Sequence, residues 1–225
     1  MNVFEQLYQT RGFASQRRYP NEQLIGFIAG NFFRADAATR AKIKMLELGC
    51  GSGANLWFVA REGFDVTGID FAPSGIALCQ TMLDIWQVQA KLQLADMTAL
   101  PFENSSFNVV FDVVSMQHLT LAQHAAALAE AHRCLQEGGQ FFSYHLAENG
   151  FIRQAVSEMV DERTVVDIPS GLPLAGNGQT CLLSTAIYLQ LLTDVGFREI
   201  SIEKQTRTYN SQSQTLEYLI VTARK

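Results

Sequence analysis

A short apolar strand that leads directly into three alternate glycines constrains the fold of this chain more than any other stretch. Residues 44–53 read KMLELGCGSG: the first half is largely apolar, as in a buried strand, and glycine then occupies positions 49, 51 and 53. Glycine permits φ > 0, and because it has no Cβ a ligand can lie directly against backbone N–H groups. A helix is expected over 54–62, with the partial positive charge of its N-terminus facing the turn. The unit therefore predicts a ligand site at the glycines.

Acidic residues end the next two predicted strands. DVTGID at 65–70 ends on Asp70, and KLQLAD at 91–96 ends on Asp96. Asp70 follows Gly49 by 21 positions, close to the ~20 residues at which nucleotide-binding βαβ units place an acid for the ribose hydroxyls. Both carboxylates are expected at the same edge of the sheet as the glycine turn.

Strands and helices then alternate along the chain. NVVFDVVSM at 108–116 predicts a fourth strand buried on both faces, and QFFSYHL at 140–146 begins a fifth. Helical periodicity covers 21–33, 74–87, 121–136 and 184–192. Alternating stretches at 198–209 and 215–225 predict a terminal hairpin. The pattern predicts an α/β fold: a doubly wound, mostly parallel seven-stranded sheet with helices on both faces and a C-terminal antiparallel hairpin.

The chain is expected to form one domain over 1–225, since its length suffices for a single large core. Residues 1–36 predict an N-terminal arm and helix over the site. Residues 147–180 interrupt the alternation, with one helical patch over 151–160, and include IPSGLPLAGNGQT, which is dense in glycine and proline. An insertion of that length is more often a lid than a linker, so we expect 147–180 to cover the pocket.

Composition argues against several partners and sites. The chain has 22 acidic and 17 basic residues and no basic cluster beyond Arg17 and Arg18, so no nucleic acid partner is expected. No apolar run approaches the ~18 to 20 residues of a membrane span, and residues 1–13 do not resemble a signal peptide, so no membrane partner and a cytoplasmic location are expected. The four cysteines are far apart without CxxC spacing, so no metal site is expected. We expect a monomer or homodimer.

With these residues placed, the chain resembles class I S-adenosylmethionine-dependent methyltransferases, specifically the small single-domain bacterial type. Three blocks carry the resemblance: LELGCGSG at 46–53, LPFENSSFNVVFDVVSMQHL at 100–119 and AHRCLQEGGQFF at 131–142. Two positions depart from the family pattern. Asn108 stands where an aspartate is usual, and Gln117-His118 stands where two histidines are common.

The resemblance implies that the glycine turn and the strand ends bind S-adenosylmethionine and its product S-adenosylhomocysteine, with no metal. The residues that fall on the family's cofactor-binding motifs are Glu47, Gly49, Cys50, Gly51, Gly53, Asp70, Phe71, Asp96 and Met97. Arg18 is a candidate for the cofactor carboxylate, because a carboxylate suits a guanidinium fork. Arg17 is its closest rival.

A base is needed only if the methyl acceptor must lose a proton. The candidates are Asp112 and His118 near the end of the fourth strand, with His145 on the fifth. Asp112 would be costly to bury in an apolar strand without a partner, so contact with substrate or with the cofactor's amino group is expected. His118, with an unperturbed pKa near 6.5, suits a general base or caps the following helix. His124 and His132 lie within that helix and are expected at its surface.

Alternatives remain at the level of function. Gly49, Gly51 and Ala54 also satisfy the dinucleotide fingerprint GxGxxG/A, which would fit a nicotinamide-dependent oxidoreductase. Glu47 directly before the turn and Asp96 after the third strand favour the methyltransferase. A SAM-binding module without catalysis is a third class. The lid and the lack of a basic surface favour a small-molecule acceptor, whose reacting atom the sequence leaves open.

Overall fold

The sheet of the protein follows the predicted order of strands. The computed structural model describes residues 3–148, 150–155 and 158–225. Within them, seven strands pair in the order β3-β2-β1-β4-β5-β9-β8. These strands are β1 (Lys44–Leu48), β2 (Asp65–Asp70), β3 (Lys91–Leu94), β4 (Phe107–Val113), β5 (Leu135–Leu146), β8 (Arg198–Tyr209) and β9 (Gln214–Arg224). The first five are parallel, and β9 runs antiparallel to both β5 and β8.

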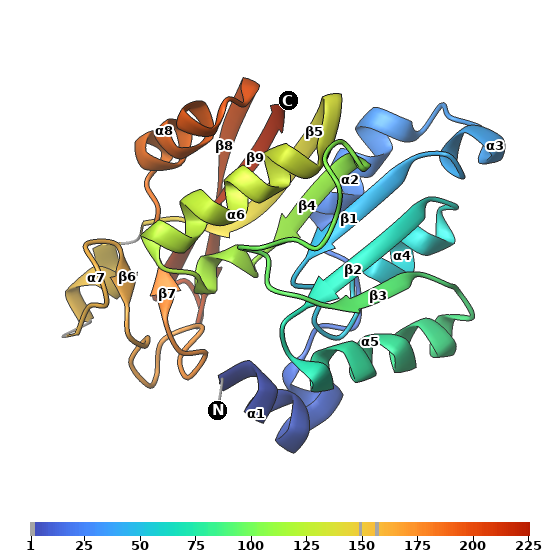
Figure 1. Ribbon diagram of the computed structural model, residues 1–225. Coiled ribbons are helices and arrows are strands. Elements are labelled where there is room, and N and C mark those ends of the chain that lie inside the picture. Colours follow the sequence, from blue (N-terminus) through green and yellow to red (C-terminus); the bar gives the residue numbers. More distant parts are fainter. Residues whose placement is uncertain (1–2, 149, 156–157) are drawn as a thin grey trace.

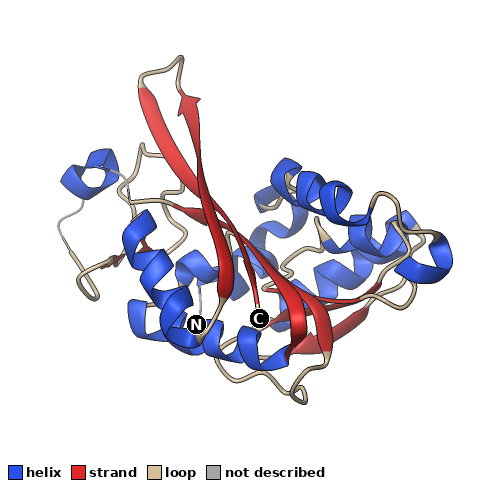
Figure 2. Cartoon of the chain, turned by 90° about the horizontal axis from the view of Figure 1, so that it is seen from above, coloured by secondary structure: helices blue, strands red, loops and turns tan. Residues whose placement is uncertain are grey.

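Helices cover both faces of this sheet (Figures 1 and 2). One face carries α2 (Glu22–Phe32), α4 (Leu56–Arg61) and α5 (Pro73–Trp86), and the other carries α6 (Leu121–Cys134) and α8 (Thr185–Val195). The shorter helices are α1 (Val3–Arg11), η1 (Gly12–Ser15), α3 (Ala37–Arg40), η2 (Met116–His118) and α7 (Gly150–Ala155). None of the helices in the described ranges is long and apolar enough to cross a membrane. The predicted fold class is confirmed.

Strand β1 lies at the point where the strand order reverses. Met45 pairs in parallel with Val66 of β2 on one side and with Val109 of β4 on the other. Successive side chains of β1 enter opposite cores, so Met45 packs with the α2, α4 and α5 layer and Leu46 with the α6 and α8 layer. Both are fully buried. In doubly wound sheets the crevice outside the strand ends at this reversal is where ligands bind.

Side-chain caps begin helices α2 and α6. The Asn21 carboxamide accepts hydrogen bonds from the N–H groups of Gln23 and Leu24 at the start of α2. Thr120 and Gln123 form a capping box at the start of α6. Each cap satisfies N–H groups that have no partner within the helix, which stabilises the helix by about 1 kcal/mol.

Several element boundaries differ from the prediction, and β4, predicted over 108–116, ends at Val113 before η2 begins at Met116. Helix α6 ends at Cys134 because the backbone turns extended at Leu135, where β5 begins, five residues before the predicted start. The helical patch predicted over 151–160 is the shorter α7, and residues 156–157 lie outside the described ranges. Within the 147–180 segment, β6 (Thr164–Val165) and β7 (Thr180–Cys181) pair as a separate two-stranded sheet.

Candidate functional site

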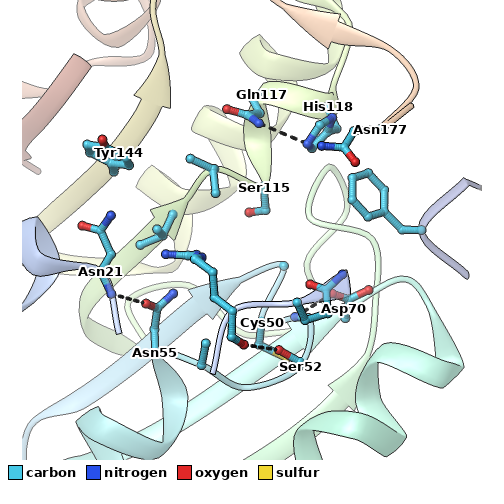
Figure 3. Close-up of a pocket in the computed structure, with 18 of the residues that line it drawn as sticks. Asn21, Cys50, Ser52, Asn55, Asp70, Ser115, Gln117, His118, Tyr144 and Asn177 are labelled. Atoms are coloured by element: carbon cyan, nitrogen blue, oxygen red, sulfur yellow. Dashed lines mark hydrogen bonds between the residues drawn. The ribbon is translucent and has the colours of Figure 1, made fainter. Parts of the chain in front are cut away.

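A cavity of about 400 Å³ opens at the carboxyl ends of the central strands. The glycine turn and Asp70 form one side of it, and Gln117, His118 and Asn177 face them from the other side (Figure 3). Tyr144 lies further along, on the side away from Asp70. The cavity therefore collects side chains from β1, β2, β5, η2 and the 147–180 segment, which are far apart in the sequence.

The glycine turn needs glycine for both conformation and space. Gly49 has φ +66° and Gly51 has φ +51°, in the left-handed region that side chains disfavour. A Cβ at Gly49 would collide with the side chain of Ser115, and one at Gly51 would lie 2.9 Å from the hydroxyl of Tyr8. The turn is held by the N–H of Cys50, which donates to the Ile69 carbonyl at 2.8 Å. Backbone groups thus form the floor of the cavity.

Asp70 ties the end of β2 to this turn. Its Oδ2 accepts from the N–H of Gly51 at 2.9 Å and its Oδ1 from the N–H of Ala72 at 2.9 Å. Burial raises the pKa of the carboxyl, and the two backbone hydrogen bonds oppose that rise. Each carboxylate oxygen keeps a second lone pair. Asp70 lines the cavity and can accept further hydrogen bonds from a ligand there.

Glu47 is buried at the base of the cavity with one oxygen unsatisfied. Its Oε1 accepts from the Asn55 amide at 2.7 Å, while its Oε2 has no hydrogen-bond partner. Desolvation raises the pKa of this carboxyl to about 8, against the opposing effects of Asn55 and the Arg17 guanidinium. An unpartnered buried oxygen is unusual in a native protein, so it marks a position for a ligand group.

The N-terminal arm lies across the cavity. Glu5 accepts hydrogen bonds from the N–H of Ser74 at 3.1 Å and from its hydroxyl at 2.7 Å, which fixes α1 at the start of α5. The ring of Phe4 meets the ring of His118 edge-on at 4.6 Å. Phe4, Tyr8 and Arg17 all line the cavity. The arm therefore contributes these three side chains to the lining of the cavity.

The remaining predicted cofactor residues differ in whether they line the cavity. Phe71 and Met97 line this cavity and also an adjoining one of about 570 Å³. Asp96 is exposed and lines only the adjoining cavity, where its Oδ1 accepts from the N–H of Thr98 at 2.8 Å. Gly53 packs instead against Cys79 of α5.

A family model described as "Methyltransferase domain" matches residues 45–139, the stretch that carries the glycine turn, Asp70 and Asp96. Residues 45–139 of this chain therefore match a methyltransferase domain. The match resolves the ambiguity of the glycine pattern, because the dinucleotide fingerprint alone fits two families. The resemblance predicted from the sequence is confirmed.

Two curated relatives align with the same region. An uncharacterised methyltransferase of Synechocystis is 33% identical over 98 residues, which make up 44% of this chain and 44% of that protein. A demethylmenaquinone methyltransferase of Thermus thermophilus is 30% identical over 107 residues, or 46% of this chain and 47% of that protein. The chain thus spans less than half the length of either relative.

A solved structure extends the likeness over the whole chain. Phosphoethanolamine N-methyltransferase 2 of Haemonchus contortus, in complex with S-adenosyl-L-methionine, superposes with a TM-score of 0.70 at 15% identity. The alignment covers 100% of this chain and 60% of that one. At that identity the likeness shows the methyltransferase fold alone.

Of the two adjacent arginines in the arm, the structure places Arg17 on the methyltransferase cavity. Arg18 is not among the lining residues, and its guanidinium stands 5.6 Å from the ring centre of Phe13. The backbone decides between them, because the Arg17 carbonyl accepts from the Ser52 hydroxyl at 3.1 Å and the Arg18 carbonyl from the Trp57 indole at 3.0 Å. The placement favours Arg17 over Arg18 for a cofactor carboxylate.

Asp112 lies behind the cavity wall rather than on it. The carboxylate is fully buried and accepts from the N–H groups of Ser115 and Met116 at 3.0 and 2.9 Å. It also accepts from the hydroxyls of Ser115 and Ser143. Burial raises the pKa of Asp112, and these hydrogen bonds oppose the rise. The partners that a buried carboxylate needs are therefore residues of the protein, and Asp112 does not line the cavity.

His118 faces the cavity with its protonation state set by its neighbours. Its Nδ1 lies 2.9 Å from the Gln179 carbonyl, which only accepts, so Nδ1 carries the proton. Its Nε2 then accepts from the Gln117 amide at 3.2 Å (Figure 3). Burial lowers the pKa of His118 to about 4. The expectation of an unperturbed pKa was wrong, and the ring is neutral at pH 7.

The third candidate base, His145, is fully buried and lies away from the cavity. Its Nε2 is 2.9 Å from the Nε2 of His124. The prediction that His124 lies at the surface was wrong, because this face of α6 packs on β5 and leaves the ring fully buried. The pair is part of the core.

Four cavity residues on the last three strands of the sheet were missed from the sequence. They are Tyr144 of β5, Arg207 and Tyr209 of β8, and Tyr218 of β9. The alternation in 198–209 does place Arg207 and Tyr209 on one face of their strand. This alternation can be seen in the sequence, but it does not predict that this face of the strand lines the cavity.

Proposed function

We propose that the protein transfers a methyl group from S-adenosylmethionine to a small-molecule acceptor. The observation that carries the proposal is the unpartnered, buried Oε2 of Glu47 beside a glycine turn that admits no Cβ. The cofactor has an ammonium group, a carboxylate and a pair of ribose hydroxyls. Glu47, Arg17 and Asp70, which line the cavity, can bind these three groups in turn. The match to the methyltransferase domain model supports the proposal.

Three contacts would hold the cofactor. Glu47 would accept from the ammonium group, which satisfies its free oxygen, and Asp70 would accept from the ribose hydroxyls. Arg17 would bind the carboxylate, since within the described chain its guanidinium has no ion pair or hydrogen bond. The turn from Gly49 to Gly51 would let the ligand lie against the backbone. Phe71, Met97 and Cys50 would form the apolar and backbone walls around it.

Bound S-adenosylmethionine supplies a methyl group already activated by the positive sulfonium, so the main task of the protein is alignment. The acceptor lone pair forms the new bond as the carbon–sulfur bond breaks, and any proton on the acceptor must leave. His118 is neutral, so its Nε2 can accept a hydrogen bond from a donor group of the methyl acceptor and so orient it. The Gln117 amide competes for the same nitrogen. Its low pKa makes it a weak base, which favours acceptors that are nucleophilic without deprotonation. Proximity then supplies most of the rate enhancement.

The 147–180 segment and the N-terminal arm would exclude water from the reacting atoms. Leu174 and Asn177 of this segment line the cavity together with Phe4 of the arm, whose ring meets that of His118. A lid that closes after binding commonly completes such sites. The cavity of about 400 Å³ is of the size of small-molecule sites, which supports a small acceptor.

The Glu47→Gln variant is expected to flatten the dependence of stability on pH. The folded-state pKa of Glu47 is raised to about 8, so its stabilising protonated form is fully present below the unfolded-state pKa and is lost as the pH rises through 8. Between about pH 5 and 8 the free energy of unfolding should fall by up to ~1.4 kcal/mol per pH unit from this group. Urea unfolding of both proteins at pH 5.5, 6.5 and 7.5 measures the difference, and equal slopes would contradict the buried, neutral Glu47.

A methyl-transfer assay separates catalysis from binding alone. S-adenosylmethionine labelled on the methyl group is incubated with the protein and pools of small metabolites, and labelled product is detected by mass spectrometry. Labelled product with release of S-adenosylhomocysteine supports the proposal. Stoichiometric cofactor binding without transfer to any pool would favour the module without catalysis.

A further inference from the structure

The end of the cavity away from the glycine turn is lined by tyrosines and one arginine. Gln205, Arg207 and Tyr209 alternate along β8 and so share one face of the sheet. Tyr218 of β9 lies directly opposite Gln205 on the same face. Tyr144 of β5 stacks on Tyr218 with ring centres 4.7 Å apart and planes at 12°. We call Tyr144, Arg207, Tyr209 and Tyr218 the tyrosine–arginine subsite.

The tyrosine hydroxyls of this subsite are hydrogen-bond donors. Burial raises the pKa of Tyr144 to about 12 and also raises that of Tyr218, so both stay protonated. The Tyr144 hydroxyl donates to Oε1 of the Gln205 side chain at 2.8 Å. The hydroxyls of Tyr209 and Tyr218 lie 3.5 Å apart, and only one can donate to the other. In the described chain, the second O–H therefore keeps a proton with no acceptor.

Arg207 adds a positive charge that no acid of the described chain neutralises. Its guanidinium stands 5.2 Å from the ring centre of Tyr209, and it takes part in none of the ion pairs found in the described ranges. Glu217, on the neighbouring strand, pairs with Lys204 at 3.0 Å instead. A guanidinium with all its donors free suits an oxyanion.

The same features disfavour other acceptors. A cationic amine would meet the Arg207 charge, and the nearby carboxylate of Glu22 already accepts from the side-chain amide of Gln205 at 2.9 Å. A purely apolar acceptor would leave the free hydroxyl of the Tyr209–Tyr218 pair without a partner, which costs free energy on desolvation, and would gain nothing from the exposed Arg207. The planar, stacked rings of Tyr144 and Tyr218 offer a flat surface next to the charge (Figure 3 shows Tyr144).

We propose that the methyl acceptor is a small molecule bearing an oxyanion, either a carboxylate or a phosphate monoester, that is bound by Arg207 and the Tyr209–Tyr218 hydroxyls. The inference rests on the proposed function, because it assigns the acceptor end of that same cavity. The anion would lie at the far end, and the rest of the acceptor would extend along the cavity toward His118 and the glycine turn.

Binding of simple anions to the protein saturated with S-adenosylhomocysteine tests the proposal. The probes are phenyl phosphate and benzoate, with benzylamine as the cationic comparison, and calorimetry gives each dissociation constant. Phenyl phosphate or benzoate should bind and benzylamine should not; the tighter of the two anions assigns phosphate or carboxylate. Arg207→Gln should weaken anion binding by about 10-fold or more and Tyr209→Phe by a few-fold.

Two control variants make the test specific. Arg198→Gln removes an exposed arginine of the same strand that does not line the cavity, and should leave anion binding unchanged. Anion binding that is equal in Arg207→Gln and in the wild type would overturn the proposal. Anion binding that is lost in Arg17→Gln but kept in Arg207→Gln would also overturn it. Anion binding through Arg207 in a protein that does not bind S-adenosylhomocysteine would keep the anion site and overturn the proposed methyl transfer instead.

Discussion

Replacing Gly49 by alanine is expected to lower the free energy of unfolding by about 3 kcal/mol and to abolish tight cofactor binding. The residue has φ +66°, where an L side chain costs ~1 to 2 kcal/mol. The new Cβ would collide with Ser115, which is held by hydrogen bonds to Asp112, so the neighbour cannot simply move away. Such overpacking costs a further ~1 to 3 kcal/mol. Urea unfolding and calorimetric titration with S-adenosylhomocysteine measure the two effects.

Gly138→Ala is the matched control for that variant. Gly138 has φ +72° but nothing within 4 Å of its virtual Cβ, so only the backbone term of ~1 to 2 kcal/mol applies. Its cofactor affinity should equal that of the wild type. An equal loss of stability in the two variants, with cofactor binding intact in both, would contradict the close approach of Ser115 to the glycine turn.

Removing the buried carboxylate of Asp112 is expected to lower the stability of the fold and not to act on methyl transfer directly. Asp112→Ala leaves the N–H groups of Ser115 and Met116 and the Ser143 hydroxyl without their acceptor. Buried donors left unpaired cost ~1 to 3 kcal/mol each where no water replaces the acceptor. The free energy of unfolding should fall by about 3 to 5 kcal/mol. Thermal and urea unfolding measure this.

Asp96→Ala provides the comparison for Asp112. Asp96 also follows a strand of the sheet, but it is exposed and bonds only to Thr98 nearby, so its loss should cost about 1 kcal/mol or less. If Asp112→Ala kept full stability and lost only methyl transfer, Asp112 would act on the ligands directly, as predicted from the sequence, and the structural role described above would be wrong.

The sheet was predictable because each strand is marked by a short pattern of neighbouring residues. The apolar run of β1 and the acid that ends β2 each depend on a few neighbouring residues, and each lies where the sequence indicated. The fold then follows from the alternation of strands and helices, which permits few arrangements. The end of α6 was misplaced because its helical pattern continues past Cys134 into Leu135, which pairs with Phe107 of β4.

Side-chain direction was less predictable, because it depends on contacts between distant segments. Arg17 and Arg18 occupy a segment without periodicity, and Ser52 and Trp57 of another segment decide which one faces the cavity. The pKa of His118 depends on its burial beneath Phe4 and its bond to Gln179, which the sequence does not reveal. The tyrosine–arginine subsite requires β9 to lie between β5 and β8, which only the tertiary pairing establishes.

Calorimetric titration of the wild type and of Asp70→Ala with S-adenosylmethionine, S-adenosylhomocysteine and NADH tests the central claim most directly. The site predicts one cofactor or product molecule bound per chain and no binding of NADH. It also predicts that Asp70→Ala weakens binding by about 5- to 150-fold, since the ribose hydroxyls and the Gly51 N–H lose their acceptor. Binding of NADH without S-adenosylmethionine, or unchanged affinity in Asp70→Ala, would contradict the account.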